Sequence, residues 1–271
     1  MVAQVVAFSV PVSGLLNSLL KPMEFPGGLS CKSADSQYEP CGRVKWYAVG
    51  TLSPDRQGMI QKVTIGDAML IHGDCQEWLA AVPQCFRVDA VVTDPFYGVG
   101  IDYGSFPDTP EQVKAVAVPV IERCRQIASC VALTSGNKHA WMYPKPDDVG
   151  VWFNPAGTGF GKFGFCLAHL ILYYGKDPKP NKSASSVTGA FDRQGESGHP
   201  CPKPIAFMRW LVDKTSLAGN TVLDPFMGSG TTGEACIQTG RKFIGVELER
   251  KYFDIACERI DQAQRQVRLC P

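Results

Sequence analysis

The stretch Thr221-Val-Leu-Asp224-Pro-Phe-Met-Gly228-Ser-Gly230-Thr-Thr232 decides the fold that we expect. Its first three residues are β-branched or aliphatic, which is typical of a buried strand. The strand runs into an acidic residue and then into a turn with two glycines. Because glycine has no Cβ, the backbone can turn tightly there and approach a ligand closely. A helix is then predicted from Thr231 to near Gly240.

A second strand is predicted after that helix, over residues 242–246, and it delivers Glu247 nineteen positions after Gly228. In strand–helix–strand units, an acidic residue about twenty positions beyond a glycine turn holds ribose hydroxyls. The pattern therefore predicts a nucleoside-bearing cofactor. The alternatives are a turn that only packs a helix against a strand and a phosphate-binding loop. The second is disfavoured because no lysine follows Gly230.

The chain has 271 residues, of which 45% are hydrophobic, as in ordinary globular proteins. This length fits one large α/β domain with an insertion, or two smaller domains. Lysine and arginine number 27 against 26 aspartates and glutamates. The net charge of +1 excludes a uniformly basic nucleic-acid scaffold, although a local patch for DNA is compatible with it.

The cysteines indicate whether the protein binds a metal, and the N-terminal residues indicate where in the cell it is expected. Eleven cysteines without a Cys-x-x-Cys pair favour reduced thiols over a disulfide framework or a zinc ribbon, and we predict no metal. Residues 1–20 are apolar only in places, so neither a signal peptide nor a membrane span is predicted. We expect a cytoplasmic protein that does not bind a membrane.

Four regions are predicted from the patterning. Residues 1–58 lack periodicity and contain many prolines and glycines, as in a poorly ordered extension; alternatively, the working protein begins at Met59. Residues 59–135 and 199–271 carry alternating strands and helices. Residues 136–198 are an insertion with many aromatic residues and glycines.

The regular elements predict an α/β fold with a mostly parallel twisted sheet and helices on both faces. Strands are predicted over residues 69–72, 88–92, 129–134 and 166–174, and helices over residues 75–82, 109–127, 204–214 and 249–267. The first strand, helix and strand follow each other closely, which implies a parallel pair with a right-handed crossover. Ligands of such sheets bind beyond the carboxyl ends of the strands. Polar residues at these ends are Asp74, Asp94, Tyr97, Asp224 and Glu247.

Asp94-Pro95-Phe96-Tyr97 is suited to hold a planar amine. The carboxylate of Asp94 and the carbonyl of Pro95 can each accept one hydrogen of an exocyclic NH₂, and the Tyr97 ring can stack on the heterocycle. This arrangement would direct the nitrogen lone pair at an electrophile such as a methyl sulfonium, without a base of raised pKa. Taken alone, the residues fit equally well an aspartate that caps a turn beside a packing aromatic ring.

Several motifs stand in consistent order along the chain: Met69-Leu-Ile-His-Gly-Asp74, Val91-Val-Thr-Asp94-Pro-Phe-Tyr97-Gly98, His199-Pro-x-x-Lys203-Pro204, the opening stretch and Phe243-Ile-Gly-Val-Glu247. Together they closely resemble the DNA amino-methyltransferases, which modify adenine N6 or cytosine N4 with S-adenosylmethionine. The tetrapeptide Asp94-Pro95-Phe96-Tyr97 precedes the glycine turn of the opening stretch, which would be the cofactor turn. This is the order in the beta group of phage or bacterial enzymes. The resemblance spans roughly residues 60–265 and implies a Rossmann-like S-adenosylmethionine-dependent methyltransferase fold.

The resemblance also implies site residues. Asp94, Pro95, Phe96 and Tyr97 would be catalytic and hold the target base. The cofactor would be bound by Asp74, Lys203, Asp224, Pro225, Phe226, Gly228, Ser229, Gly230, Thr231, Thr232 and Glu247. Within this set, Glu247 would hold the ribose hydroxyls, Asp74 would meet the adenine, and Lys203 would lie near the methionine end.

A double-stranded DNA substrate is implied, with the target base flipped into the pocket because its amine is buried in the duplex. Residues 136–198 would then be the target-recognition region. Its lysines are suited to phosphate contacts, although a solvated loop has the same composition: Lys162, Lys176, Lys179 and Lys182. The aromatic residues of this region are expected to pack, with insertion into DNA as the alternative. A homodimer is compatible with the sequence.

Phe96 departs from the family pattern, which has a second proline at this position. The change restores an N–H and frees Pro95 from the restriction that a following proline imposes, so the carbonyl is aimed less rigidly. We expect Phe96 to add an apolar wall and the chemistry to survive. The alternative is a catalytically impaired DNA-binding relative that still holds the cofactor.

Adenine N6 is the expected target, because the family associates Asp in the first motif position with adenine. Cytosine N4 is the alternative. Methylation of a protein glutamine or of a small-molecule amine fits less well, since those relatives usually place the cofactor turn first and lack the insertion. The reaction needs no histidine, so His72, His139 and His169 are expected to be structural.

Overall fold

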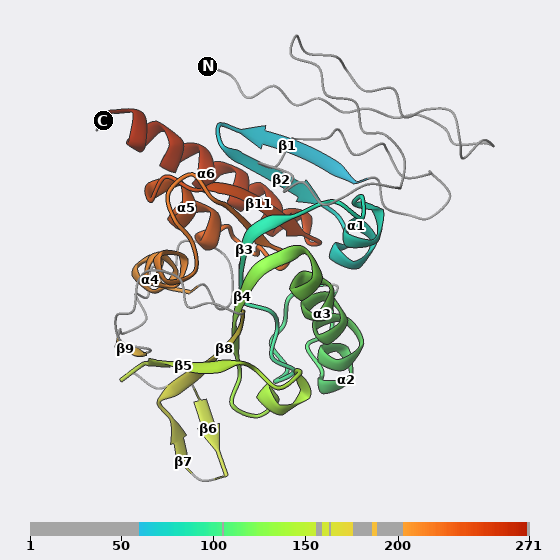
Figure 1. Cartoon of the computed structure of the whole chain (residues 1–271). Coiled ribbons are helices and arrows are strands. Elements are labelled where there is room, and N and C mark those ends of the chain that lie inside the picture. Colours follow the sequence, from blue (N-terminus) through green and yellow to red (C-terminus); the bar gives the residue numbers. More distant parts are fainter. Residues whose placement is uncertain are drawn as a thin grey trace, which may run out of the picture.

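The computed structural model describes residues 60–104, 106–155, 159–162, 164–175, 186–188 and 203–269. The predicted extension, residues 1–58, lies outside these ranges, as do Lys176, Lys179, Lys182 and His199. In the described part of the chain, one nine-stranded sheet runs through the molecule with helices on both faces (Figure 1). The predicted α/β class is confirmed.

Five parallel strands form the centre of the sheet, and each coincides with a predicted strand to within two residues. In spatial order they are β2 (Ala68–His72), β11 (Lys242–Glu247), β10 (Thr221–Asp224), β3 (Val88–Thr93) and β4 (Ala128–Ser135). The strands β2 and β3 are parallel but not neighbours, so the predicted pair is wrong in that respect. The two C-terminal strands lie between them, and the local spacing of the first elements carries no information about this.

Further strands extend the sheet at both edges, and most of them pair antiparallel with their neighbours. β1 (Gln61–Ile65) pairs with β2 through a turn at Gly66-Asp67, a dipeptide that is typical of hairpins and that could have predicted this strand. At the other edge, β4 is followed in space by β8 (Ala168–Gly175), β5 (Asp148–Phe153) and β9 (Ser186–Thr188). β6 (Gly159–Gly161) and β7 (Gly164–Cys166) form a separate hairpin. Residues 136–198 therefore continue the main sheet in part.

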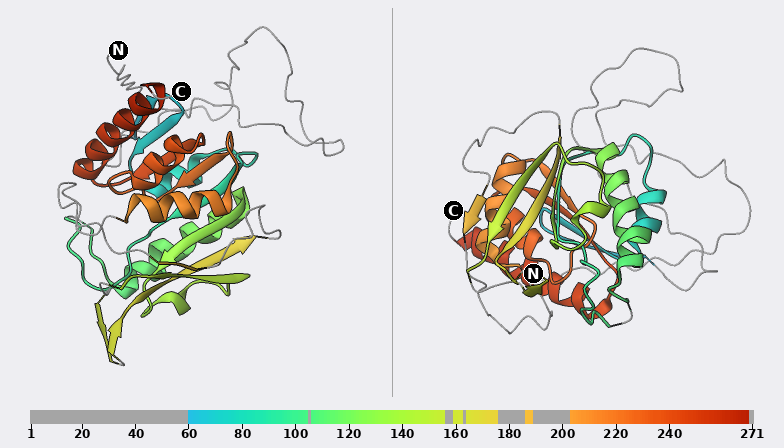
Figure 2. Two further views of the ribbon diagram at one scale, coloured as in Figure 1. Left: turned by 90° about the vertical axis from the view of Figure 1, so that its left-hand side faces the viewer. Right: turned by 90° about the horizontal axis from the view of Figure 1, so that it is seen from below.

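The helices form two layers, which the right-hand view of Figure 2 separates. One layer contains α1 (Cys75–Ala81), α2 (Pro110–Gln112), the π-helical η1 (Val113–Ala117) and α3 (Val118–Ile127). The other contains α4 (Ile205–Thr215), α5 (Thr231–Gln238) and α6 (Arg250–Leu269). Because side chains alternate along a strand, Leu70 packs in the core under α4–α6, while Met69 and Ile71 pack in the core under α1 and α3.

The predicted helix over residues 109–127 is present but contains a π-helical turn. Thr109 caps its start, where its side chain accepts a hydrogen bond from the backbone N–H of Gln112 at 3.3 Å. Pro119 has no N–H to donate to the preceding turn, and the backbone N–H of Val118 bonds instead to the carbonyl of Val113, five residues earlier. The proline therefore widens the helix locally without ending it.

The strands β3 and β10 are parallel neighbours, and the chain continues from them to opposite faces of the sheet. β3 leads into the layer of α3, whereas β10 leads into α5 on the other face. Such a switch point opens a crevice beyond the carboxyl ends of the two strands, and ligands of open α/β sheets bind in such crevices. Asp94 follows β3 directly and Asp224 ends β10, so the sheet brings these predicted residues together.

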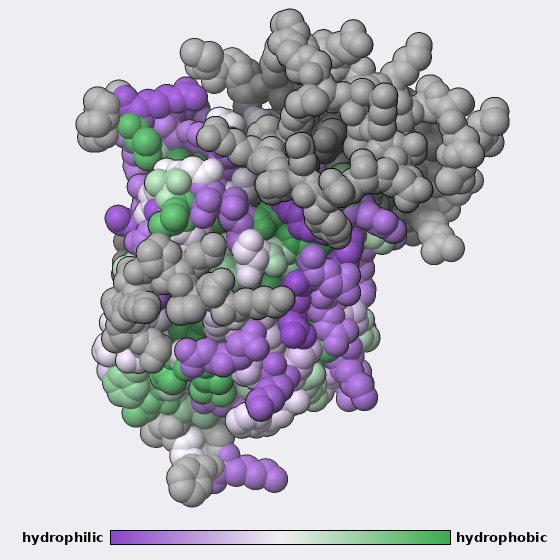
Figure 3. All heavy atoms as spheres, in the orientation of Figure 1, coloured by the Kyte–Doolittle hydropathy of each residue, from purple (hydrophilic) through white to green (hydrophobic). Residues whose placement is uncertain are grey.

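Every helix in the described part of the chain is too short or too polar to cross a lipid bilayer. The seven cysteines that the structure describes carry thiols and form no disulfide with one another. On the face drawn in Figure 3, hydrophobic side chains gather over β5, where Val149 is 43% and Phe153 is 37% exposed.

The two glycines of the opening stretch both have positive φ, 54° for Gly228 and 83° for Gly230, as the sequence predicted for a tight turn. Gly230 starts α5 in the left-handed conformation. A Cβ at this position would lie 2.8 Å from the Cβ of Ala256 on α6, which is closer than packed atoms approach. The absence of a side chain at Gly230 therefore lets α5 and α6 pack together.

We expect Gly230→Ala to lower the free energy of unfolding by about 2–4 kcal/mol, because it adds a collision with α6 to the backbone strain. Gly219→Ala is the matched control, since Gly219 has φ 82° and no atom lies within 4 Å of the place that its Cβ would take. It should cost about 1 kcal/mol, from strain alone. Urea unfolding of both variants measures the difference, and equal costs would contradict the packing role.

Candidate functional site

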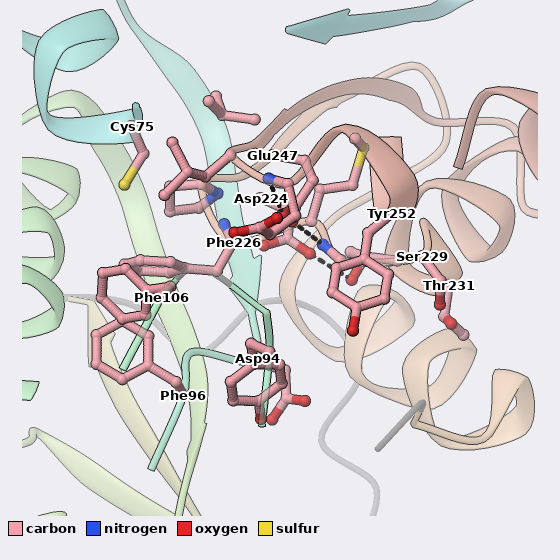
Figure 4. Close-up of a pocket in the computed structure, with 18 of the residues that line it drawn as sticks. Cys75, Asp94, Phe96, Phe106, Asp224, Phe226, Ser229, Thr231, Glu247 and Tyr252 are labelled. Atoms are coloured by element: carbon pink, nitrogen blue, oxygen red, sulfur yellow. Dashed lines mark hydrogen bonds between the residues drawn. The ribbon is translucent and has the colours of Figure 1, made fainter. Parts of the chain in front are cut away.

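The crevice at the switch point is a cavity with an empty volume of about 1000 Å³, including the space at its open mouth. Most of the predicted site residues line it, from the ends of β2, β3, β10 and β11, from the segments that follow these strands, and from the residue before Pro204. They are Asp74, Asp94, Phe96, Lys203, Asp224, Pro225, Phe226, Gly228, Ser229, Thr231, Thr232 and Glu247. In Figure 4, Phe96 and Phe106 lie together on one side of the cavity, Thr231 and Tyr252 on the other.

Three predicted site residues are not among those that line the cavity: Pro95, Tyr97 and Gly230. Gly230 instead packs against α6. Pro95 is buried, and Tyr97 is partly buried with its hydroxyl on the carboxylate of Asp94, at 2.6 Å. The tetrapeptide therefore contributes Asp94 and Phe96 to the lining of this cavity, and Pro95 and Tyr97 are next to them in the chain.

Asp224 joins three elements through its carboxylate. Oδ1 accepts hydrogen bonds from the Thr93 hydroxyl at the end of β3, at 2.6 Å, and from the backbone N–H of Phe226, at 3.0 Å. Oδ2 accepts one from the Thr232 hydroxyl on α5, at 2.6 Å. Burial raises the pKa of Asp224 to about 6, although these hydrogen bonds act to lower it. Asp224 therefore fixes the turn rather than offering a free carboxylate.

Glu247 is held by the backbone on both oxygens and still lines the cavity. Oε2 accepts a hydrogen bond from the N–H of Gly228, and Oε1 accepts one from the N–H of Glu249, both at 2.8 Å. Burial raises the pKa of Glu247 to about 7, against the lowering effect of these two bonds. A carboxylate oriented in this way can accept further hydrogen bonds from a pair of ligand hydroxyls.

Asp74 caps the start of α1. Its Oδ1 accepts hydrogen bonds from the N–H groups of Gln76 and Glu77, at 2.6 and 3.2 Å. This contact satisfies donors at the first turn of the helix, and the second carboxylate oxygen is left for the cavity.

Asp94 is surrounded by three donors. Tyr97 and the Thr134 hydroxyl both donate to Oδ1, and the ammonium of Lys203 lies 2.6 Å from Oδ2. The side chain of Lys203 is 6% exposed and that of Asp94 is 21% exposed, so this ion pair is largely shielded from water. Burial acts to raise the pKa of Asp94, but Lys203 and the hydroxyl donors outweigh it and hold this pKa below its usual value.

Sequence reasoning did not identify Thr93 and Thr134 as site residues. Both stand at the carboxyl end of a parallel strand, which is the signal that could have found them. It also did not indicate that Lys203 contacts Asp94, because more than a hundred residues separate them and only the fold brings them together.

The histidines and aromatic residues have identifiable packing roles. The Nδ1 atom of His139 lies 2.7 Å from the carbonyl of Tyr97, and His169 is buried and stacks on Trp152 at 5.0 Å between ring centroids. His72 packs against Phe253. In the predicted recognition region Trp152 is fully buried, whereas Trp141 is 83% exposed.

Phe96 packs between two other rings. Its centroid lies 4.7 Å from that of Phe106 and 5.9 Å from that of Phe226, which belongs to the glycine turn. Residue 96 therefore connects the tetrapeptide after β3 with the turn after β10 by ring packing, and it forms an apolar wall of the cavity.

The cavity is acidic. The described residues that line it include one lysine, Lys203, and five carboxylates: Asp74, Asp94, Asp224, Glu247 and Glu249. Since like charges repel, this surface disfavours a ligand with several phosphates and favours one that carries hydroxyls and positive charge. Within the described ranges, no group of three or more His, Cys, Asp or Glu side chains is arranged to hold a metal ion.

Known proteins match this chain in sequence. A family model described as DNA methylase, of the N6/N4 methyltransferase type, matches residues 150–258. Type II methyltransferase M.HpaI of Haemophilus parainfluenzae is 28% identical over 214 residues, which covers 64% of this chain and 68% of that protein. Type II methyltransferase M.HinfI of Haemophilus influenzae is 26% identical over 261 residues, which covers 74% and 71%.

Solved structures share the fold. M1.HpyAVI in its complex with SAM superposes with a TM-score of 0.55 and 23% identity, covering 72% of this chain and 99% of that one. The cytosine-N4-specific PvuII DNA methyltransferase superposes with a TM-score of 0.59 and 15% identity, covering 75% and 93%. At these identities the likeness shows the architecture alone.

Substitution of Asp224 should separate its hydrogen bonds from its charge. Asp224→Ala leaves three buried donors without an acceptor and should lower the free energy of unfolding by about 3 kcal/mol or more. Asp224→Asn keeps an acceptor and should change the free energy of unfolding by less than about 1 kcal/mol at neutral pH. Urea unfolding of the two variants beside wild type measures this.

The raised pKa of Asp224 predicts that the stability difference between wild type and Asp224→Asn depends on pH. The folded protein holds a proton on Asp224 up to a pKa of about 6, whereas the unfolded chain releases it near 3.8. Wild type should therefore lose stability relative to Asp224→Asn as the pH rises from about 4 through about 6. A constant difference over that range would show that Asp224 titrates normally.

Proposed function

We propose that the chain is an S-adenosylmethionine-dependent DNA methyltransferase of the kind that modifies adenine N6 or cytosine N4, and that it methylates adenine N6 at specific sites in double-stranded DNA. The observation that carries the proposal is that the glycine turn, Glu247 and Asp94 of the tetrapeptide line the same cavity. The protein would act as a monomer or as a homodimer. It would act in the cytoplasm, where its DNA substrate would be.

The charged groups of the cavity suit S-adenosylmethionine. The sulfonium carries a positive charge and the ribose carries two hydroxyls, and both suit a cavity with five carboxylates. A redox dinucleotide would bring a pyrophosphate into the same acidic surface. When bound, S-adenosylmethionine supplies an electrophilic methyl group, so that attack by an amine forms a nitrogen–carbon bond and breaks the sulfur–carbon bond.

The cofactor half of the site would be formed by the glycine turn and the ends of β2 and β11. Glu247 would accept hydrogen bonds from the ribose hydroxyls, and Phe226 offers an apolar ring. Asp74 would meet the adenine through the oxygen that does not cap α1. Among the remaining predicted residues, Thr231 and Ser229 line the cavity, whereas Gly230 acts through packing.

The amine half would be formed by Asp94, the carbonyl of Pro95 and the ring of Tyr97. The two acceptors would orient the NH₂ group, so that its lone pair points at the methyl group. The proton that the methylated nitrogen loses can pass to the Asp94 carboxylate and from there to water. Because a paired base cannot reach this depth, the target base would be flipped out of the duplex.

Adenine is proposed over cytosine because Asp94 occupies the first position of the tetrapeptide, where the family associates Asp with adenine. Residues 136–198 are proposed as the target-recognition region, residues 59–135 as the catalytic half and residues 199–271 as the cofactor half. Two described residues of the recognition region support this, since Lys162 is exposed and Trp141 is 83% exposed.

The ring packing of Phe96 favours an active enzyme. Contacts with Phe106 and Phe226 can hold the tetrapeptide against the cofactor turn, which supplies by packing some of the rigidity that a second proline would give. The impaired relative is the second candidate, because residue 96 retains the freedom that proline would remove.

Incubation of the full chain with S-adenosylmethionine and mixed-sequence duplex DNA should give N6-methyladenine in the nuclease digest, detected by mass spectrometry. Asp94→Ala should lower kcat by about 100-fold or more while cofactor affinity stays within about twofold, because the acceptor of the amine is lost. Detection of N4-methylcytosine in place of N6-methyladenine would show that the target base is cytosine. Cofactor binding without methyl transfer, with activity recovered in Phe96→Pro, would establish the impaired relative.

Cofactor affinity should rise with pH through about 7. The carboxylate of Glu247 accepts hydrogen bonds best when it is ionised, and burial raises its pKa to about 7. We expect the Kd for S-adenosylmethionine to fall by up to about tenfold between pH 6 and pH 8 in wild type. Calorimetry on Glu247→Gln gives the control, since any titration of the ligand itself persists in this variant. If the Kd of wild type and that of Glu247→Gln changed with pH in the same way, Glu247 would not bind the ribose.

A further inference from the structure

We propose that Lys203 is a positioning residue for Asp94: it holds Oδ2, so that Oδ1 is the atom that receives the target amine, in place of the Tyr97 hydroxyl. This inference rests on the proposed function and deepens it. It differs from the expectation that Lys203 lies near the methionine end of the cofactor.

The contacts of Lys203 place it with the tetrapeptide. Its ammonium lies 2.6 Å from Oδ2 of Asp94 and 4.9 Å from the centre of the Tyr97 ring. The residue as a whole is 8% exposed, so the ammonium is removed from most of the solvent. A buried ammonium needs a counter-charge, and Asp94 provides it at hydrogen-bonding distance.

The fold fixes Lys203 through a stack of aromatic rings. Lys203 immediately precedes Pro204, the residue that caps α4, and Phe207 on this helix stacks on Trp152 of β5 at 4.6 Å. Trp152 stacks in turn on His169 of β8, whose ring lies 5.5 Å from that of Tyr97. Lys203 and Tyr97, which both contact Asp94, are therefore supported by the same stack.

The two oxygens of Asp94 have different partners. Oδ2 is engaged by a cation, and an ion pair that is largely shielded from water is costly to break. Oδ1 is engaged by two hydroxyls, of Thr134 and Tyr97. A hydroxyl can rotate away and find another partner at low cost, so an incoming N–H replaces the Tyr97 hydroxyl more readily than it replaces Lys203.

Other titratable groups face Asp94 from the elements packed around it. They are Tyr97, Lys203 before α4, His169 on β8, Asp224 on β10 and Tyr143. Burial lowers the pKa of His169 to about 4, so this ring is neutral near neutral pH and adds no positive charge. Among these groups Lys203 supplies the positive charge that keeps Asp94 ionised.

Lys203→Met tests the assignment, because it keeps most of the length of the side chain and removes the charge. We expect kcat to fall by about tenfold to a hundredfold and the acid limb of the pH profile of kcat to move up by about one pH unit or more, while the Kd for S-adenosylmethionine stays within about twofold. Lys214→Met, at the other end of the same helix, should leave all three quantities unchanged. A raised Kd with an unmoved acid limb would assign Lys203 to the methionine end and overturn the proposal.

Two further measurements complete the test. Tyr97→Phe keeps the ring and removes the hydroxyl on Oδ1, so kcat/KM for DNA should stay equal or rise a few-fold; a loss of more than about tenfold would overturn the exchange at Oδ1. A ¹³C NMR titration of the aspartate carboxyls needs no turnover. In it, Lys203→Met should raise the pKa of Asp94 even if DNA proves not to be the substrate, and an unchanged pKa would refute the role of Lys203.

Discussion

The hydrogen bonds of Asp224 hold the site together. This one carboxylate accepts from the end of β3, from the backbone of the turn after β10 and from the first turn of α5. It therefore ties together the two strands between which the cavity opens. The cost of burying the carboxylate is seen in its raised pKa, and the three donors offset that cost.

The two halves of the cavity use carboxylates in different ways. Glu247 is held by backbone N–H groups, so its orientation depends only on the turn and the strand end. Asp94 is held by side chains from β4, from its own turn and from the residue before Pro204. Glu247 is thus oriented by one continuous stretch of chain, whereas Asp94 is oriented by residues from three separate parts of it.

Phe96 connects the tetrapeptide to the glycine turn through its ring. Proline restricts the backbone by itself, whereas phenylalanine can restrict it only through what its ring contacts. Here the ring meets Phe106 and Phe226, so the position of the tetrapeptide becomes coupled to the cofactor turn. Under the proposed function, these rings would link cofactor binding at the turn to the orientation of the amine.

The sequence by itself determined the strands of the parallel sheet, the glycine turn and the residues at the strand ends, because buried β-branched runs and positive-φ glycines depend on local chemistry. It did not determine that β10 and β11 lie between β2 and β3, or that Gly230 serves the contact with α6. Only the tertiary structure decided the partners of Asp94. Thr134 and Lys203 are distant in sequence, and it is the order of the strands and the packing of α4 that brings them to this carboxylate.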